Sequence, residues 1–334
     1  MSVSLRFFER PYPSANMIII QGKRPVLVDS GFGSDLCRTE SLLCRAGVRP
    51  EDIQFIVNTH YHSDHTGGNS GLQKKYGLAI AAHRWEGQLV NDRHREACCA
   101  HWLKQPVEPY QVLVLLEDGD EINTGDNLAR VCHTPGHTMG HISIYLPNTQ
   151  ELICGDMLQA NDVGWINIFR EGVCALQVTL DSLEKLDRMP LRLVYPGHGP
   201  VIAEPRQVIS RARKRLEKWL TRPKEAAWHA CKRIFAYALM INGGLPRSEI
   251  SRYLLYCGWF IDFCTHVFRV EPADLIQPLL DEMIRTGAGY WRDEHLLAGT
   301  PYISPGEDWN PRQIAWPEQW PYYRTNIEQG MADS

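Results

Sequence analysis

The sequence lacks the features that mark membrane, secreted and nucleic-acid-coating proteins. No run of apolar residues approaches the roughly 18 that a membrane span needs, and Met1–Arg10 contains no apolar segment of the kind found in secretion signals. The formal net charge is only −4, which argues against a protein that coats nucleic acid. These absences predict a cytoplasmic protein with no membrane partner.

Two common motifs are also missing or incomplete. The 10 cysteines are scattered without a CxxC pair, so neither a disulfide framework nor a zinc-thiolate site is predicted. We expect most of them to be small buried residues. Gly31 and Gly33 lack the third glycine of a dinucleotide fingerprint, because Leu36 stands in its place.

What remains is the composition of an ordinary globular protein, 44% hydrophobic and 22% charged. Short β-branched runs alternate with helical patterns in the first two thirds of the chain. A polar helical insertion is predicted at 86–104. The expected strands lie at 16–21, 25–29, 79–82, 111–116, 128–133, 142–146, 152–154 and 193–195, and the expected helices at 35–46, 71–76 and 175–188. This alternation predicts a layered α/β domain over residues 1–204.

The rest of the chain has a different character. Residues 205–299 read as mostly helical, with helices at 224–241, 246–255 and 271–286 and a hairpin at 287–296, which is a winged-helix-like pattern. The tail 300–334 alternates proline with tryptophan, so we expect no regular helix or sheet there. It should wrap the body or a neighbouring subunit, which leaves a homodimer open.

The most informative stretch is 59–68, THYHSDHTGG, which directly follows the apolar run 53–57. Residues two apart on an extended segment point the same way, so His60 and His62 can bind one ion together. Asp64 and His65, where the chain turns, can face a second ion. Neutral imidazole and carboxylate are ligands that zinc and its first-row neighbours accept.

Three more turns carry ligand-type side chains. His137 lies in TPGHT, Asp156 follows Gly155, and His198 lies between two glycines in PGHG. Each comes at the end of an apolar run, where side chains from several strands converge on one rim of a sheet. His141, close behind His137, is expected to support the ligands or to pack rather than to bind metal.

In this order, HxHxDH, TPGHT, GD and PGHG resemble the motifs of the metallo-β-lactamase-fold hydrolase superfamily, over roughly residues 10–204. The resemblance implies an αββα sandwich with two metal ions in a cleft at the sheet edge. It implies one metal held by His60, His62 and His137, a second held by Asp64, His65 and His198, and a bridge between them by Asp156.

The resemblance also implies a mechanism. A metal-bound hydroxide would attack a carbonyl or phosphorus, with Asp64 as the catalytic residue that orients the hydroxide or relays a proton. Zinc is the default metal, and iron and manganese are the alternatives. Our first hypothesis is hydrolysis of a carboxylic thioester, ester or lactone on a small-molecule, acyl-carrier or coenzyme A-linked substrate.

The second half resembles the β-lactamase-like protein 2 group, which includes endoribonucleases and thioesterases. An RNA phosphodiesterase is therefore the second hypothesis, and a non-catalytic metal-binding scaffold is the third. The basic stretch 206–233 is either a solvated helix face or an anion-binding wall. Trp165, Ile166, Ile168 and Phe169 are either core or an apolar substrate pocket. The other histidines are expected to be structural or exposed, with His133 undecided: His83, His94, His101, His229, His266 and His295.

Overall fold

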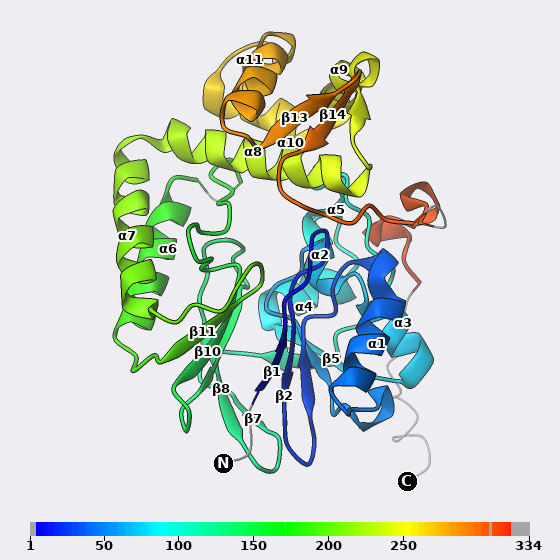
Figure 1. Cartoon of the computed structure of the whole chain (residues 1–334), viewed down its shortest axis with the longest axis vertical. Helices are drawn as coiled ribbons and strands as arrows, with labels where there is room; N and C mark the ends of the chain where they lie inside the picture. The colour runs from blue at the N-terminus through cyan, green and yellow to red at the C-terminus, as the bar shows by residue number, and fades with distance from the viewer. Residues whose placement is uncertain (1–4, 171, 307–308, 322–334) are drawn as a thin grey trace.

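The computed structural model describes residues 5–170, 172–306 and 309–321. Two β-sheets pack face to face with helices on their outer faces, and a mostly helical part follows (Figure 1). The αββα arrangement predicted from the sequence is confirmed. Within the described ranges, no helix has the length and apolar character needed to cross a membrane.

The first sheet has six strands in sequence order. The strands β1, β2 and β3 are antiparallel neighbours, whereas β3 to β6 run parallel. Their bounds are β1 (Leu5–Phe8), β2 (Met17–Ile20), β3 (Val26–Val28), β4 (Ile56–Val57), β5 (Ile80–His83) and β6 (Val114–Leu116). Because β3 to β6 are parallel, the loops that follow them leave from one edge of the sheet.

The second sheet has the order β11-β10-β9-β8-β7. Only β10 and β11 are parallel neighbours in it. The bounds are β7 (Glu121–Asn123), β8 (Leu128–His133), β9 (Ile142–Leu146), β10 (Glu151–Gly155) and β11 (Leu193–Pro196). The turns that contain Asp156 and His198 therefore follow two adjacent strands that point the same way.

Side chains that alternate in direction along the strands pack into two separate hydrophobic cores. Ile18 and Ile20 of β2 belong to the core between the sheets, whereas Met17 and Ile19 belong to the core under the helices. Successive side chains of a strand point to opposite faces, so an all-apolar strand is buried on both sides. The strand β2 is fully buried for this reason.

Helices cover both outer faces of the sandwich. Figure 1 shows α1 and α3 beside the first sheet and α6 and α7 beside the second, where these two helices pack on each other. The bounds are α1 (Leu36–Arg45), α2 (Ser63–Thr66), α3 (Asn69–Tyr76), α4 (Arg84–Asn91), α6 (Cys174–Asp187) and α7 (Pro205–Thr221). The helix α2 is a single turn within the histidine-rich stretch.

The structure corrects several sequence predictions. The insertion 86–104 is not one helix, because α4 ends at Asn91 and the left-handed backbone conformations of Arg93, Cys98 and Cys99 interrupt the rest. After α4 the chain is helical only in two short pieces, Ala97–Cys99 and α5 (Ala100–Leu103). The strand predicted at 111–116 starts at Val114, and the short edge strands β1 and β7 have no predicted counterpart. All ten cysteines are free thiols and most are buried, as predicted.

The region 223–298 contains the predicted helices and hairpin. Helix α8 is long and runs across the top of the sandwich in Figure 1, and a small sheet of order β12-β14-β13 lies above it. The bounds are α8 (Pro223–Ile241), β12 (Leu245–Pro246), α9 (Arg247–Tyr256), α10 (Gly258–Asp262), α11 (Pro272–Arg285), β13 (Gly289–Arg292) and β14 (His295–Ala298). A π-helical turn at Phe263–Phe268 was not expected. The domain divisions at 204 and 299 stay predictions.

The described part of the tail lies on the body of the same chain. Trp309 packs against Phe32 with ring centroids 5.1 Å apart, and the fully buried Trp320 packs against Tyr110. The backbone N–H of Ile303 also donates to the carbonyl of Tyr12. Within 300–306 and 309–321, the regular helical structure of the tail consists of two short 3-10 turns, Pro311–Gln313 and Pro317–Gln319. Residues 322–334 of the tail lie outside the described part, and a homodimer stays a prediction.

Six of the ten basic residues in the stretch 206–233 are paired with acidic residues, most of which lie elsewhere in the chain. Arg213 contacts Glu184 and Asp187 of α6, and Lys232 contacts Glu282 of α11. Further ion pairs join Lys218 and Arg222 to Glu225, and Arg215 and Arg233 to Asp162. Most of this charge therefore joins α7 and α8 to their neighbours, and only Arg233 reaches the cleft described below.

Candidate metal centre

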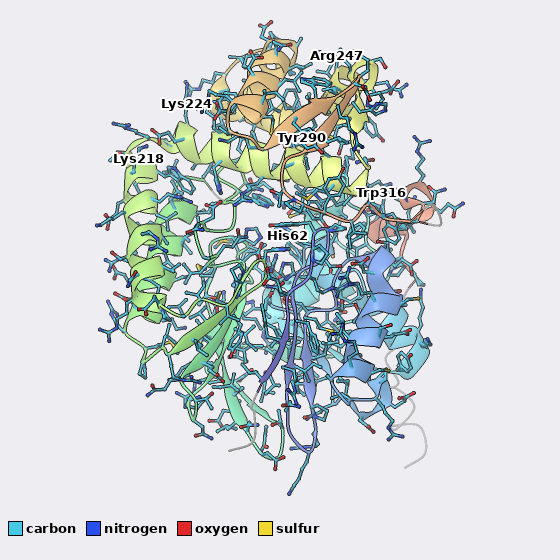
Figure 2. The ribbon with its side chains drawn as sticks, viewed as in Figure 1. His62, Lys218, Lys224, Arg247, Tyr290 and Trp316 are labelled. Carbon is cyan, nitrogen blue, oxygen red and sulfur yellow. The ribbon has the colours of Figure 1, made fainter. Side chains whose placement is uncertain are left out.

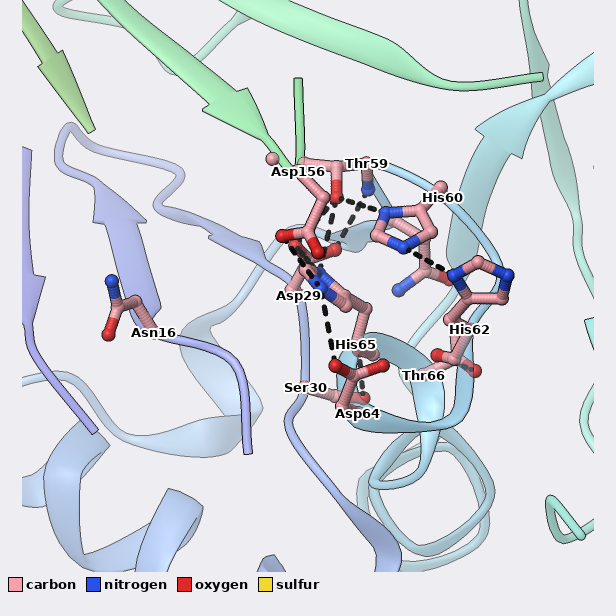
Figure 3. A network of polar contacts seen from close by, with 12 residues as sticks. Asn16, Asp29, Ser30, Thr59, His60, His62, Asp64, His65, Thr66 and Asp156 are labelled. Atoms are coloured by element: carbon pink, nitrogen blue, oxygen red, sulfur yellow. Dashed lines mark hydrogen bonds and ion pairs between the residues drawn. The ribbon is translucent and has the colours of Figure 1, made fainter. Parts of the chain in front are cut away.

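The structure brings all seven predicted ligand residues together at one edge of the two sheets. The loop after β4 supplies four of them, and the loops after β8, β10 and β11 supply one each. Figure 2 shows His62 beneath α8, and Figure 3 shows five of the seven side chains in contact. The seven are His60, His62, Asp64, His65, His137, Asp156 and His198, and all are buried except the partly exposed Asp64.

Three imidazoles form the first group. His62 Nδ1 lies 3.1 Å from His60 Nε2 and 3.0 Å from His137 Nε2. Burial, reinforced by the neighbouring histidines, lowers the pKa of His60 and His62 well below the ordinary value, and burial also lowers the pKa of His137. Three neutral rings that aim nitrogens at one point fit a shared cation, because their lone pairs would otherwise repel.

A second group lies beside the first. His198 Nε2 donates to Asp64 Oδ2 over 3.0 Å, and His65 Nε2 lies 3.8 Å from the same oxygen. Burial opposes ionisation of Asp64, but His65 and His198 outweigh it and lower the pKa of the carboxyl. A carboxylate with two imidazoles is again a donor set that suits a divalent first-row ion.

Asp156 lies between the two groups. Its Oδ2 is 3.8 Å from His137 Nε2, whereas its Oδ1 is 3.4 Å from His65 Nε2 and 3.8 Å from His198 Nε2. Among the described residues, the buried Oδ1 and His65 Nε2 have no hydrogen-bond partner. A Cβ at Gly197 would stand 2.4 Å from Oδ1, so only glycine fits there. The donors thus fit two ions that share one carboxylate.

Polar contacts at Nδ1 of three histidine rings orient those rings so that the lone pair of Nε2 faces the centre of the site. His65 Nδ1 donates to Asp29 Oδ2 over 2.7 Å, and His137 Nδ1 donates to the carbonyl of Trp165 over 2.6 Å. Thr59 Oγ1 donates to Asp29 Oδ2 and lies 3.2 Å from His60 Nδ1. Each of these contacts leaves Nε2 of the ring free to bind a cation.

Asp29 is the important site residue that the sequence analysis missed. It follows the buried strand β3 in the way that Asp156 follows β10, and this position could have identified it. Its backbone is left-handed, with φ of 58°. Burial opposes protonation of His65, but Asp29, Asp64 and Asp156 together raise the pKa of His65 well above the ordinary value.

Replacement of Asp29 by asparagine should weaken metal binding. Asparagine tolerates the left-handed backbone but removes the charge that orients His65. We expect metal affinity to fall about 10- to 100-fold, measured by competition with a chromogenic chelator. The exposed Asp126→Asn is the control. Equal affinity in the two variants would show that Asp29 is not needed to orient the site.

The other histidines lie outside the ligand cluster. His141 Nε2 accepts from the backbone N–H of Asp156 over 3.2 Å, so it supports the loop, as expected. His133, which was undecided, contacts the carbonyl of Met139 and stacks on His83 with centroids 4.2 Å apart. His229 binds Asp162 and His101 binds Glu318, whereas His94, His266 and His295 are exposed.

A cleft opens over the cluster. Its floor includes Asp64, Asp156 and His198, and its roof is α8, through side chains that include Arg233, Tyr237 and Met240. Apolar walls come from Leu103, Val163 and Trp165. The ring of Tyr12 stacks on His198 with centroids 4.5 Å apart. Of the segment weighed as an apolar pocket, Trp165 lines the cleft, whereas Ile166 and Ile168 are core.

A family model, the metallo-beta-lactamase superfamily, matches residues 10–198 of the chain. The chain belongs to the metallo-β-lactamase superfamily. The predicted family and enzyme class, a hydrolase of this fold, are confirmed, and the ligand cluster is one that can hold metal ions. The closer resemblance to the β-lactamase-like protein 2 group stays a prediction.

Relatives in this superfamily carry hydrolase names. A probable metallo-hydrolase of Methanocaldococcus jannaschii is 28% identical over 189 residues, which are 56% of this chain and 89% of the relative. Hydroxyacylglutathione hydrolases of Rhodospirillum rubrum and Brucella anthropi are 34% and 31% identical, over 48% and 54% of this chain. The matches span 53% and 60% of those two relatives, so roughly half of each is compared.

Solved structures support the fold alone, because their identities are low. A metallo-β-lactamase family protein from Thermus thermophilus superposes with a TM-score of 0.57 at 22% identity, covering 88% of this chain and 98% of the other. The subclass B3 metallo-β-lactamase BJP-1 of Bradyrhizobium japonicum gives 0.52 at 18% identity, over 64% and 89%. The first of these likenesses extends beyond residue 198, into the C-terminal helices.

Proposed function

We propose that this protein hydrolyses carboxylic thioesters, with esters and lactones as related substrates, by means of two divalent ions. The observation that carries the proposal is Asp156, whose two oxygens face two separate groups of ligand-type side chains. The likeness to hydroxyacylglutathione hydrolases favours a thioester among the carbonyl substrates.

The seven residues divide between the two ions. His60, His62 and His137 would hold one, whereas Asp64, His65 and His198 would hold the other, and Asp156 would contact both. Such ions supply Lewis acidity and a water of lowered pKa. We propose zinc as the metal, with iron and manganese as alternatives, since His/Asp donor sets accept all three.

Residues of the chain orient the reactants and move protons. An oxygen of Asp64 would orient the attacking water, take its proton and pass it to the leaving sulfur, which needs a proton to leave as a thiol. Burial raises the pKa of Tyr12, so its phenol stays protonated and can donate to the substrate beside His198. The walls formed by Leu103, Val163 and Trp165 suit the apolar part of an acyl group.

The alternatives have less support. An RNA phosphodiesterase was favoured by the basic stretch 206–233, but six of its ten basic residues are paired with acidic side chains, which reduces the positive charge available to a nucleic acid backbone. A non-catalytic scaffold needs no cleft above its metal ligands, whereas this cluster forms the floor of one.

The test is hydrolysis of two matched panels by metal-replete protein. One panel holds acyl thioesters, esters and lactones, and the other holds bis(p-nitrophenyl) phosphate and short RNA. We expect turnover of the carbonyl panel, loss of turnover with a chelator, and recovery with zinc, iron or manganese. RNA cleavage with no carbonyl turnover would overturn the proposal, and no turnover of either panel despite bound metal would favour the scaffold.

A further inference from the structure

A partly buried charge cluster borders the cleft. Asp162, in the loop that follows the bridging Asp156, is ion-paired with Arg215 of α7 and Arg233 of α8. His229 Nε2 also lies 3.1 Å from both Asp162 oxygens. Asp162 thus fastens the loop after β10 to both helices, and it holds one nitrogen of the Arg233 guanidinium in place.

The charges in this cluster do not cancel. Burial lowers the pKa of His229, so this ring adds no full charge at neutral pH. Two guanidinium groups, on Arg215 and Arg233, then face the single carboxylate of Asp162 and leave an excess of one positive charge. Arg233 pairs with Asp162 through Nη2. The other two guanidinium nitrogens of Arg233 make no hydrogen bond within the described part of the chain, and 34% of the side chain is exposed.

One of these two guanidinium groups, that of Arg233, faces the reaction site. Arg233 lines the same cleft as Asp64, Asp156 and His198. Among the described residues that line the cleft, Asp64 and Asp156 are the only carboxylates, and both belong to the ligand cluster. When divalent ions offset those two charges, no acidic side chain of the lining is left to neutralise Arg233. The cleft is then positive and suits an anionic ligand.

We propose that Arg233 is a specificity-determining residue that binds an anionic oxygen group of the substrate, and that Asp162 positions it. This inference rests on the proposed thioesterase function and names its substrate class. The anion is a carboxylate on the acyl part or a phosphate on the leaving part, since a guanidinium binds either through paired N–H groups. A substrate without the anion leaves the guanidinium nitrogens that do not contact Asp162 without a partner, which is the basis of discrimination.

The test compares substrates with and without an anionic group. Succinyl and butyryl thioesters of N-acetylcysteamine have acyl groups of similar length, and only the succinyl group carries a carboxylate. Butyryl thioesters of coenzyme A and of N-acetylcysteamine share the acyl group, and only the larger leaving part of coenzyme A carries phosphates. The measured quantity is the ratio of kcat/KM within each pair, which cancels differences in the fraction of folded, metal-loaded enzyme.

The variants are Arg233→Met, Arg233→Lys and, as a matched control, Arg211→Met. Arg211 contacts the same loop, at the carbonyl of Ala160, but does not line the cleft. We expect Arg233→Met to lower one of the two ratios about 10- to 100-fold, with lysine restoring part of it because it keeps the charge but not the planar fork. Arg211→Met should keep both wild-type ratios.

Each outcome either identifies which part of the substrate carries the anion or overturns the inference. A fall in the succinyl-to-butyryl ratio assigns a carboxylate on the acyl part, and a fall in the coenzyme A ratio assigns a phosphate. Unchanged ratios in both Arg233 variants would overturn the inference while leaving the proposed function intact.

A binding measurement separates this inference from the proposed function. Calorimetric titration with succinate and with butyrate needs no turnover, so it applies even if no thioester is hydrolysed. We expect wild-type protein to bind succinate more tightly than butyrate. A preference that persists unchanged in Arg233→Met would count against Arg233 as the binding residue.

Discussion

Replacement of Asp64 by asparagine is expected to reduce thioester hydrolysis on the order of 10³-fold. Asparagine keeps the size of the side chain, but it cannot accept a proton at neutral pH or carry the charge that faces His65 and His198. The initial rate with a chromogenic thioester measures the loss. Metal content, measured on the same samples, distinguishes lost chemistry from a lost ion.

The matched control for this variant is Asp52→Asn. Asp52 is an exposed carboxylate paired with Arg49, outside the ligand motif, and its loss should leave turnover unchanged. Residual activity in Asp64→Asn close to that of Asp52→Asn would mean that Asp64 neither orients water nor moves a proton. The role proposed for it would then be wrong, even if the ions bind.

Glu86 on α4 is expected to make folding strongly dependent on pH. Its carboxyl accepts from Thr138 Oγ1 at Oε1, while the buried Oε2 has no hydrogen-bond partner within the described residues. Burial raises the pKa of Glu86 from 4.5 to about 8, so the folded protein holds a proton that the unfolded chain has released. Between those two pH values the folded state binds more protons than the unfolded state.

Stability should therefore fall as pH rises from about 4.5 to about 8, by roughly 1.4 kcal/mol per pH unit from this group. Glutamine has the same shape but does not ionise, so Glu86→Gln should remove this slope and be the more stable protein at pH 8 by several kcal/mol. Urea unfolding of metal-free protein at a series of pH values measures the difference from wild type.

The exposed Glu51→Gln serves as the control and should keep the wild-type slope. Parallel stability curves for Glu86→Gln and the wild type would mean that Glu86 is already ionised in the folded protein. In that case a buried cation or water must satisfy Oε2, because an ionised carboxylate without a partner is costly to bury.

The sequence predicted the ligand cluster well because each motif is local. The four motifs in this order resemble those of metallo-β-lactamase-fold hydrolases, and this resemblance named the seven positions without coordinates; their role as ligands stays a prediction. Most strands of the two sheets and the helices α8, α9 and α11 were also predictable, from alternation and from helical periodicity.

The sequence does not reveal which distant residues pair with the charged side chains. Nothing near Arg233 in the sequence points to Asp162, and nothing near Arg213 points to Glu184 on α6. The stretch 206–233 therefore looked like free positive charge. The interruption of the 86–104 helix was hidden for a related reason, because left-handed residues such as Cys98 and Cys99 are held by tertiary packing rather than by composition.

The roof of the cleft has an evolutionary consequence. The seven ligand-type residues all lie between His60 and His198, whereas the side chains that face them from above lie on α8, from Arg233 to Met240. The ligand-type residues and the roof of the cleft are thus encoded in separate stretches of the gene, whereas walls such as Trp165 belong to the first stretch. Mutation or recombination confined to the later stretch can give a descendant a new substrate while every ligand of the ions is inherited unchanged.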